Sequence, residues 1–432
     1  GAYIACTQYK MGDNEPYLYK SKDYGQTWTI IISGIPNDYF TRVVRADPKQ
    51  AGLLYAGTER GMFVSFDDGA SWKPFQMNLP IVPVTDAVIK DDNLIVATQG
   101  RSFWMIDDLT VLHQLSEEVA SKPFHLFKPM DAYRIAGPRF RRRGGGGGAS
   151  LLYGTNKPGG AVVYYYMKEA PAKGTKVKME VFDPKGELVK EYKQKPKAGL
   201  NMFNWNMMYD NAEGFEGLIM WAGTLRGPMA PPGTYTVKLH VGDEVVEETF
   251  KLLRDPRYPS TDADLQAQFD FLIKVRDKVT ETHRAIKDIR AAREQMDQLM
   301  DRIKGVDEYK DVKKAGKELM EKMTEIEETL YQTKNQSGQD PLNFPIRLNN
   351  KLAALTGVAG SGAWAPTAQA EAVRSELTKQ IDGQLEKLDK LMSNDLPDFN
   401  NLVKQKSVDA IIIKKKKDDK ATEPDTSSED NH

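Results

Sequence analysis

The sequence contains a single cysteine, Cys6, among its 432 residues. One cysteine excludes an internal disulfide and any zinc site built from several cysteines. No apolar run approaches the ~18 residues that a membrane-spanning helix requires, so no transmembrane segment is predicted. Lysine plus arginine number 60 and aspartate plus glutamate 61, and this balance gives no general attraction to nucleic acid. The low cysteine content fits a reducing cytosol, and equally a bacterial periplasmic or surface protein built without disulfides.

Recognisable catalytic and metal-binding motifs are also missing. The histidines are scattered without a metal-ligand spacing, so neither a metal ion nor a cofactor is predicted. They are His113, His125, His240, His283 and His432. No G-x-S-x-G motif of a serine hydrolase occurs. Among the many acidic residues, no motif singles out the two carboxylates that glycoside hydrolysis usually requires.

Two octapeptides, SKDYGQTW at 21–28 and SFDDGASW at 65–72, carry the same four residue types at the same offsets. These residues are Ser21, Asp23, Gly25 and Trp28 in the first octapeptide, and Ser65, Asp67, Gly69 and Trp72 in the second. In a hairpin the Asp accepts hydrogen bonds from turn amides, the Gly takes a positive φ, and the Ser bonds locally. The Trp covers the hairpin with a large apolar face. We therefore predict a structural role for both octapeptides rather than a catalytic one.

The octapeptides belong to a longer repeat in the first third of the chain. The segment 53–72 alternates strands and turns, and 94–109 repeats its first part, with ATQGR following the pattern of AGTER. A period of about 40 to 45 residues with about four strands per unit is typical of propeller blades. We find about two and a half blades, over 1–34, 40–78 and 82–114. Propellers typically close with 4 to 8 blades, so the remainder is expected from an N-terminal portion, a partner polypeptide or another copy.

The two octapeptides resemble the Asp-boxes, or BNR repeats, of sialidases, sortilin-type propellers and xyloglucan-type glycoside hydrolases. The whole run from 42 to 110 resembles the last blades of large bacterial sortilin-like propeller proteins, which are often labelled glycosyl hydrolases. This resemblance implies a secreted, periplasmic or cell-surface protein. The opening GAYIACTQYK has the pattern of the middle of a strand, so we expect a part of something longer. In the xyloglucan-type enzymes the catalytic aspartates belong to earlier blades, and none is carried over to this chain.

Loop residues of the repeat are the candidates for ligand binding: Arg60, Gln99, Arg101 and Trp104. Sialidases bind the substrate carboxylate with three arginines, and Arg42, Arg60 and Arg101 sit on successive units. Arg60 and Arg101 occupy equivalent positions, however, which favours a repeated structural role. The ligand of such a surface would be a glycan or a peptide.

Residues 151–256 predict an Ig-like β-sandwich, because strand-like runs alternate with turns such as DPKGE. The run GLNMFNWNM followed by PPGTYTVKL resembles the Ig-like module of flagellar hook-capping proteins and many secreted enzymes. The resemblance implies a core built on Trp205 and a Pro-Gly-Thr-Tyr turn. The long insertion at 210–231 is expected to pack onto the propeller.

Three stripes of apolar residues with helical spacing lie within 261–404 and predict a small antiparallel bundle. The first is Ile286, Ile289, Met296, Met300 and Ile303; the second Tyr309, Val312, Leu319, Met323, Ile326 and Leu330; the third Val373, Leu377, Ile381, Leu385, Leu388 and Met392.

The segment 116–150, with RFRRRGGGGGAS, is predicted to be a linker because it lacks the Lys-Ser/Thr ending of a P-loop. The charged tail at 405–432 is predicted to be disordered.

The sequence thus predicts a multidomain protein, mainly β plus α. Its parts are partial propeller blades at 1–115, the linker at 116–150, the sandwich at 151–256, the bundle at 261–404 and the tail at 405–432. The predicted function is binding and assembly, with the missing blades supplied by an N-terminal portion or partner. One alternative is a glycoside hydrolase whose catalytic carboxylates lie in the missing blades. A second is a peptide-binding receptor or chaperone, in which the channel captures extended segments.

Overall fold

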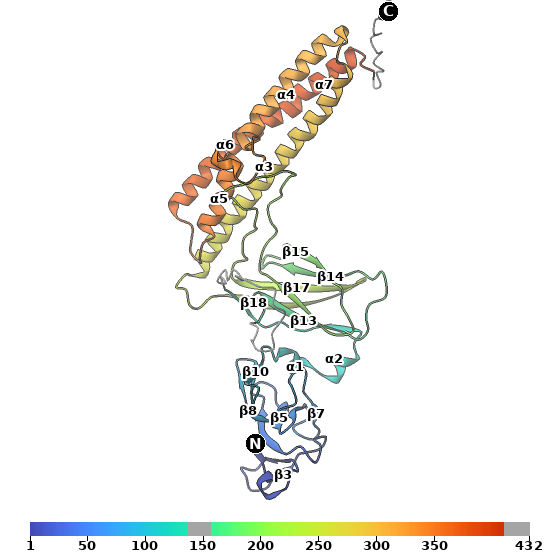
Figure 1. Ribbon diagram of the computed structural model, residues 1–432, viewed down its shortest axis with the longest axis vertical. Helices are drawn as coiled ribbons and strands as arrows, with labels where there is room; N and C mark the ends of the chain where they lie inside the picture. Colours follow the sequence, from blue (N-terminus) through green and yellow to red (C-terminus); the bar gives the residue numbers. More distant parts are fainter. Residues whose placement is uncertain (136–156, 410–432) are drawn as a thin grey trace, which may run out of the picture. The chain divides into compact units, whose positions relative to one another are not determined.

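The computed structural model describes residues 1–135 and 157–409 and divides into two compact units (Figure 1). One unit comprises Gly1–Tyr209 and Met229–Asp262, and the other comprises Asp210–Pro228 and Ala263–His432. Sheets make up the first unit and helices the second, which confirms the predicted combination of β and α structure. The described residues form no closed propeller. The Arg/Gly-rich run at 139–150, the tail from 410 and His432 lie outside the described residues.

Three antiparallel sheets follow one another along the first 106 residues, each with its strands in chain order. The first sheet contains β1 (Ala2–Cys6), β2 (Tyr17–Ser21) and β3 (Thr29–Ile30), with a short 3-10 turn η1 (Tyr9–Met11) between β1 and β2. The second contains β4 (Thr41–Ala46), β5 (Leu54–Thr58), β6 (Gly61–Ser65) and β7 (Lys73–Pro74). The third contains β8 (Val84–Lys90), β9 (Asn93–Thr98) and β10 (Phe103–Ile106).

The second sheet lies between the other two, and its strands β5 and β6 are buried throughout. Side chains alternate between the faces of a strand. Leu54 and Ala56 therefore join a core with residues of the first sheet, including Leu18. Tyr55 joins a separate core with residues of the third sheet, including Leu94. The middle sheet thus has both faces covered, while each flanking sheet has only one face covered by this stack.

The rest of the first unit is a two-layer β-sandwich around a single core. One sheet has the order β11 (Phe124–Leu126), β13 (Ala161–Met167), β16 (Gly199–Trp205). The other has the order β12 (Ala132–Arg134), β18 (Glu244–Arg254), β17 (Gly233–Val241), β14 (Val177–Phe182), β15 (Leu188–Lys193). All neighbours are antiparallel except β12 and β18. Trp205 and Tyr235 are fully buried with ring centroids 5.1 Å apart, and the Tyr235 hydroxyl donates to the Pro231 carbonyl at 2.8 Å.

The prediction of a linker at 116–150 is wrong for residues 116–135, the part that the structure describes. The chain leaves the third sheet through α1 (Thr110–Gln114) and α2 (Glu117–Ser121) and then forms β11 and β12. Phe124, Leu126 and Ala132 are buried in the sandwich core. These strands are only three residues long, so the sequence pattern did not distinguish them from a loop.

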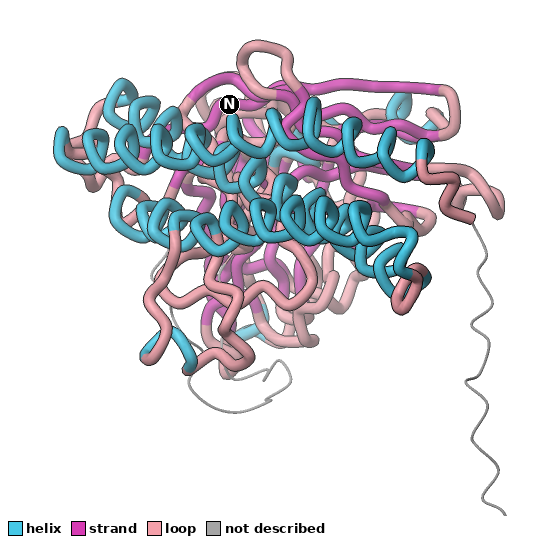
Figure 2. Tube along the Cα trace, turned by 90° about the horizontal axis from the view of Figure 1, so that it is seen from above, coloured by secondary structure: helices cyan, strands magenta, loops and turns pink. Residues whose placement is uncertain are grey.

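The second unit is built from long helices around its own core (Figure 2). They are α3 (Asp262–Arg302), α4 (Lys310–Leu330), α5 (Leu348–Ala359), α6 (Ala368–Lys390) and α7 (Leu396–Gln405), with 3-10 turns η2 (Asp307–Tyr309) and η3 (Asp340–Leu342) and a π-helical turn η4 (Leu391–Asp395) joining α6 to α7. The predicted stripes line the core, except that Val373 is exposed. Helix α5 lies between the second and third predicted stripes.

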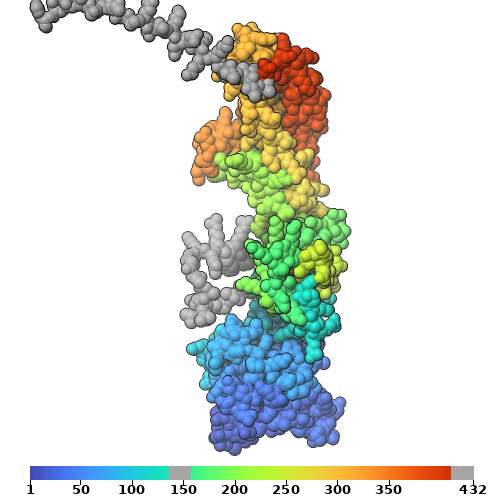
Figure 3. Space-filling model, turned by 90° about the vertical axis from the view of Figure 1, so that its right-hand side faces the viewer, coloured from blue at the N-terminus to red at the C-terminus, as the bar shows by residue number. Residues whose placement is uncertain are grey.

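The insertion after β16 belongs to the helical unit, so its predicted packing onto the propeller is wrong. Ala212 is buried in the helical core, and Phe215 packs its ring edge-on at 5.0 Å against both His283 of α3 and Tyr331. The Tyr331 hydroxyl donates to the Gly217 carbonyl at 3.2 Å. In Figure 3 this segment is the light green surface against the yellow and orange helices.

Candidate functional site

Each octapeptide closes a hairpin through the same set of hydrogen bonds. In the second, the Ser65 hydroxyl accepts from the Gly69 amide at 2.9 Å and donates to Asp67 Oδ1 at 2.7 Å. Asp67 also accepts from the Ser71 amide at 2.8 Å and from the Ser71 hydroxyl at 2.5 Å. The first octapeptide repeats these bonds with Ser21, Asp23, Gly25 and Thr27, at 2.8, 2.9, 2.9 and 2.5 Å. The seventh position therefore contributes too, and the hydroxyl residue shared there by both copies was the signal that the sequence analysis missed.

The hairpin bonds determine the ionisation of the two aspartates. The hydroxyl of Thr27 and then its amide lower the pKa of Asp23 to about 2. Burial acts to raise the pKa of Asp67, but the bonds from Ser71 and Ser65 outweigh it and lower that pKa to about 2 as well. A carboxylate with so low a pKa is a poor general base near neutral pH. The geometry therefore supports a structural role for both aspartates.

The second octapeptide also holds the first sheet. The Trp72 side chain is buried, with 3% of the residue exposed, and its indole N–H donates to the Ile31 carbonyl at 2.7 Å. Asp68 accepts from the Tyr3 hydroxyl and from Lys20 Nζ, both in the first sheet. Burial and then the bond to Asp68 raise the pKa of Tyr3 to about 12. Gly69 packs so closely that an added Cβ would lie 2.6 Å from Ile31.

Among the described residues, the corresponding residues of the first octapeptide bind no other sheet. Trp28 is 39% exposed, and its indole N–H donates to Gly25 of its own hairpin at 3.1 Å. Tyr24, at the position of Asp68, is fully exposed. Ile4 and Ile30 are exposed and share one face of the first sheet, because both pair with Tyr19. We use the name first outer face for Ile4, Tyr19 and Ile30 together with Tyr24 and Trp28 of the first octapeptide.

The third sheet has an exposed apolar face at the other end of the stack. Val88 and Met105 both pair with Ile95 across this sheet, and Phe103 lies on the same face of β10 as Met105. Val88, Phe103 and Met105 are exposed. We call these four residues the second outer face. By its pairing, Met105 corresponds to Val64 of β6, which the third sheet covers; the exposed fractions are 57% and 4%.

The four predicted ligand-binding residues are engaged locally. Arg60 forms an ion pair with Asp38 at 3.0 Å and lies over the ring of Tyr39. The Trp104 indole N–H donates to the Arg101 carbonyl at 3.0 Å, and the backbone N–H of Gln99 donates to the Pro83 carbonyl at 2.9 Å. Within 1–135 and 157–409, no hydrogen bond or ion pair joins Arg60 to the other three.

Two of the three arginines considered for a sialidase are paired with carboxylates. Arg42 forms an ion pair with Glu59 at 2.6 Å, and Arg60 is paired with Asp38. The third, Arg101, donates to the Gly100 carbonyl at 3.1 Å. The pairing of Arg42 and Arg60 does not favour the sialidase hypothesis.

A histidine–aspartate pair that the sequence analysis missed lies beside a cavity of about 650 Å³. His113 Nε2 lies 2.8 Å from Asp47 Oδ2, and the Asp47 side chain is fully buried. Burial acts to raise the pKa of Asp47, but the bonds from His113 and two backbone amides lower it. In the described part of the chain, the side-chain hydrogen bond and ion pairs of His113 are with the carboxylates of Asp47 and Asp92, and none is with a nucleophilic side chain. The pair therefore anchors α1 to the β4–β5 loop and supports no covalent mechanism.

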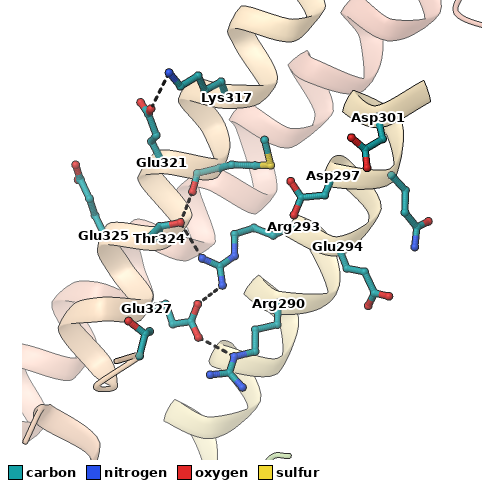
Figure 4. A pocket seen from close by; sticks show the side chains of 13 residues that line it. Arg290, Arg293, Glu294, Asp297, Asp301, Lys317, Glu321, Thr324, Glu325 and Glu327 are labelled. Atoms are coloured by element: carbon teal, nitrogen blue, oxygen red, sulfur yellow. Dashed lines mark hydrogen bonds and ion pairs between the residues drawn. The ribbon is translucent and has the colours of Figure 1, made fainter. Parts of the chain in front are cut away.

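A groove of the helical unit lies between α3 and α4, with a volume of about 1070 Å³ (Figure 4). At one end Glu327, almost fully buried, accepts from Arg290 at 2.7 Å and from Arg293. Arg293 also donates to Thr324 at 2.7 Å. These ion pairs join the two helices, so the polar end of the groove is structural.

Metal-binding and membrane-spanning features are not found in the described residues. No group of three or more acidic, histidine or cysteine side chains within 1–135 and 157–409 is arranged to hold a metal ion. No helix in these ranges is both long enough and apolar enough to cross a membrane.

Comparisons with known proteins identify no family. No family model matches the chain, and no curated protein matches it. Among solved structures, a mutant of Salmonella alpha-2-macroglobulin shares 14% identity over 51% of this chain and 13% of its own, with a TM-score of 0.18. An ancestral GH74 enzyme shares 13% identity over 55% of this chain and 27% of its own, with a TM-score of 0.18. Trypsin-activated alpha-2-macroglobulin from Escherichia coli shares 16% identity over 49% and 13%, with a TM-score of 0.17. This chain thus spans about a quarter or less of the length of these three proteins, and the TM-scores are too low to support a shared fold.

Proposed function

We propose that this chain is the binding and assembly part of a β-propeller protein. In this proposal the three N-terminal sheets are blades, and the two outer faces receive further blades. The observation that carries the proposal is the difference between the sheets: the middle one is buried on both faces, whereas each flanking sheet leaves an apolar face exposed.

The exposed apolar faces of the two flanking sheets are unfavourable in water. Contiguous apolar surface on a folded protein marks a site of interaction, because burying it is favourable by about 25 cal/mol per Å². The first outer face comes with an octapeptide whose counterpart holds a neighbouring sheet through Trp72 and Asp68. Three blades are also fewer than the roughly 4 to 8 that close a propeller.

The remaining features belong to the same proposal at a finer level. We take the two-layer sandwich to be Ig-like, and the resemblance of the sequence supports a secreted, periplasmic or bacterial surface protein. A glycan or peptide ligand would bind the completed propeller. A glycoside hydrolase would need its two carboxylates on other blades, since Asp23 and Asp67 are committed to their hairpins.

Native mass spectrometry of the protein purified from its source tests this proposal. We expect this sequence to be joined to, or complexed with, polypeptide that carries further copies of S-x-D-x-G-x-[ST]-W. Hydroxyl-radical footprinting should then show Ile30 and Phe103 protected, with exposed Leu200 of β16 as the matched control. A protein found alone, with all three residues labelled equally, would contradict the proposal.

A further inference from the structure

The second and third sheets differ at one edge. In the second sheet β7 pairs with β6 as a fourth strand, whereas β10, which corresponds to β6, lies at the edge of the third sheet. Within 1–135 and 157–409, no strand pairs with the outer side of β10. An uncovered strand edge presents a row of backbone N–H and C=O groups with which another polypeptide can pair.

Phe103 and Met105 direct their backbone groups toward this open side. The Ser102 carbonyl accepts from β9 at 3.1 Å, and successive residues of a strand alternate in the side to which they bond. The second sheet follows the same pattern, because the carbonyl of Met62, at the position of Phe103, accepts from the backbone N–H of Phe75 at 2.8 Å. A strand laid along β10 therefore finds two residues with which it can pair.

A small apolar pocket of about 50 Å³ lies beside the same edge. Trp104 and Ile106 of β10 line one side, and Phe75 and Leu79, which follow β7, line another. Trp104 and Ile106 are on the face of the third sheet that packs on the second. Because side chains alternate between the faces of a strand, every second side chain of an added strand would point to this face. The pocket is thus placed to receive one apolar side chain from such a strand.

The second sheet shows which kind of side chain fills the corresponding position. Strand β7 pairs Lys73 with Val64. The same register places Trp72 opposite Ser65, and Trp72 is buried in the core between the first two sheets. Ile106 occupies the position of Ser65 in β10, since it follows the counterpart of Val64. A bulky apolar side chain opposite Ile106 would therefore enter the pocket.

Charged side chains at the two ends of β10 give an orientation. Arg101 precedes the strand and Asp107 follows it, and within 1–135 and 157–409 neither forms an ion pair. A strand antiparallel to β10, as β7 is to β6, runs from Asp107 toward Arg101. A lysine or arginine at its start and an aspartate or glutamate at its end complement these charges.

We propose that the open edge of β10 binds an extended peptide of another protein as an antiparallel fourth strand of the third sheet. The peptide begins with a basic residue, places a bulky apolar side chain opposite Ile106, and ends with an acidic residue. This inference rests on the proposed binding function and names the class of its ligand. Hydrogen bonds between strands lie in the plane of the sheet, so the edge stays open when a further blade covers the second outer face.

Fluorescence anisotropy with a labelled synthetic peptide tests the site, using protein that carries all the polypeptide it has at its source. The probe is the segment 70–77 of this chain, ASWKPFQM, with Ser71→Lys and Met77→Glu. In the register of β7 these two charges lie opposite Asp107 and Arg101. We expect the probe to bind, and exchanging its two end charges should weaken binding at least about threefold.

Methylation of single backbone nitrogens of the probe tests the strand pairing. Methylated Phe75 should bind at least about tenfold more weakly, because it loses the N–H that bonds to the Phe103 carbonyl. Methylated Gln76 is the matched control and should change binding less than about threefold, since its N–H points away from β10. A probe that does not bind, or that binds equally after either methylation, would overturn the inference.

Two variants at one position of β10 test the same contact from the protein side. Met105→Pro should weaken binding of the probe at least about tenfold, because it removes a backbone N–H that faces the open edge, where proline is tolerated. Met105→Ala keeps this N–H and should stay within about threefold of the unmodified protein. Equal binding by both variants, each folded by circular dichroism, would contradict the proposal. If the probe does not bind while Ile30 and Phe103 are protected in footprinting, the peptide site is excluded and the proposed assembly stands.

Discussion

Trp28 and Trp72 occupy the same position in hairpins with matching hydrogen bonds, yet their surroundings differ. Trp72 is buried against the neighbouring sheet and donates to Ile31, whereas Trp28 is partly exposed and donates within its own hairpin. The octapeptide thus forms its turn by itself, and the packing of its tryptophan depends on whether a preceding sheet is present.

Replacing each tryptophan separates these two roles. Trp72→Ala should lower the free energy of unfolding of the sheet region by roughly 3–5 kcal/mol, because it removes a buried ring and leaves a cavity. Trp28→Ala should cost less than about 1 kcal/mol in dilute, dissociated protein, since a partly exposed ring loses little burial. Both changes in the free energy of unfolding are measured by urea unfolding, monitored through hydrogen exchange of the sheet amides because this signal does not depend on tryptophan. Equal losses would show that the first sheet is already covered.

At the scale of elements, the insertion after β16 is bound to the helices through a buried histidine. His283 Nδ1 lies 2.6 Å from the Glu213 carbonyl, which only accepts, so this nitrogen carries the hydrogen. Nε2 accepts from the Asn349 side-chain amide at 3.1 Å, while the Asn349 oxygen accepts from the Asn350 amide. A neutral ring therefore satisfies all partners from the insertion, α3 and α5.

This arrangement predicts that acid weakens the helical unit. Burial lowers the pKa of His283; the bond to the Glu213 carbonyl opposes this shift, and the charge of Lys287 adds to it. The unfolded state binds the proton more readily, so the contribution to stability is complete above about pH 6.5 and is lost as the pH falls toward the folded pKa. The loss is at most about 1.4 kcal/mol per pH unit for one proton.

Urea unfolding followed by helical circular dichroism at pH 7.5, 6.5 and 5.5 measures this dependence. His283→Gln should be less stable at pH 7.5 and nearly independent of pH in this range. His240→Gln, in the sandwich, is the control and should keep the dependence of the unmodified protein. An unmodified protein with constant stability across these values would contradict the prediction.

At the scale of the whole molecule, the chain crosses between its units more than once. It leaves the sandwich after Tyr209, contributes 210–228 to the helical unit, returns at Met229 and crosses again after Asp262. The helical unit therefore contains the segment 210–228, which strands β17 and β18 of the sandwich separate from the helices along the sequence. Ending the chain at Asp262 therefore removes the helices but leaves 210–228, a segment of the helical unit, attached to the sandwich.

A chain ending at Asp262 should consequently expose the insertion. Chymotrypsin should cleave within 210–228 at least about ten times faster than in the full chain, because Phe215 loses its contacts with His283 and Tyr331. Adding residues 263–409 as a separate polypeptide should slow the cleavage again. If the rates are the same with and without the helices, the insertion is held by the first unit instead.

The sequence alone determined the features that depend on neighbours along the chain. The hairpin bonds of the octapeptides span at most four residues, so Ser65, Asp67 and Gly69 could be assigned from their offsets. The core stripes of α3 and α4 followed from helical spacing, because one face of a helix recurs every three to four residues. The strands of the sandwich followed from alternation and turns, apart from the short β11 and β12.

Only the tertiary structure decided which surfaces meet. Trp28 and Trp72 have the same local pattern, and their different burial comes from a sheet that is present on one side only. The insertion, the Asp47–His113 pair and the position of Arg60 against Asp38 depend on residues brought together by folding. Local sequence patterns report hydrogen bonds and periodicity within one element, whereas these contacts depend on how separate elements pack, and no local spacing encodes that packing.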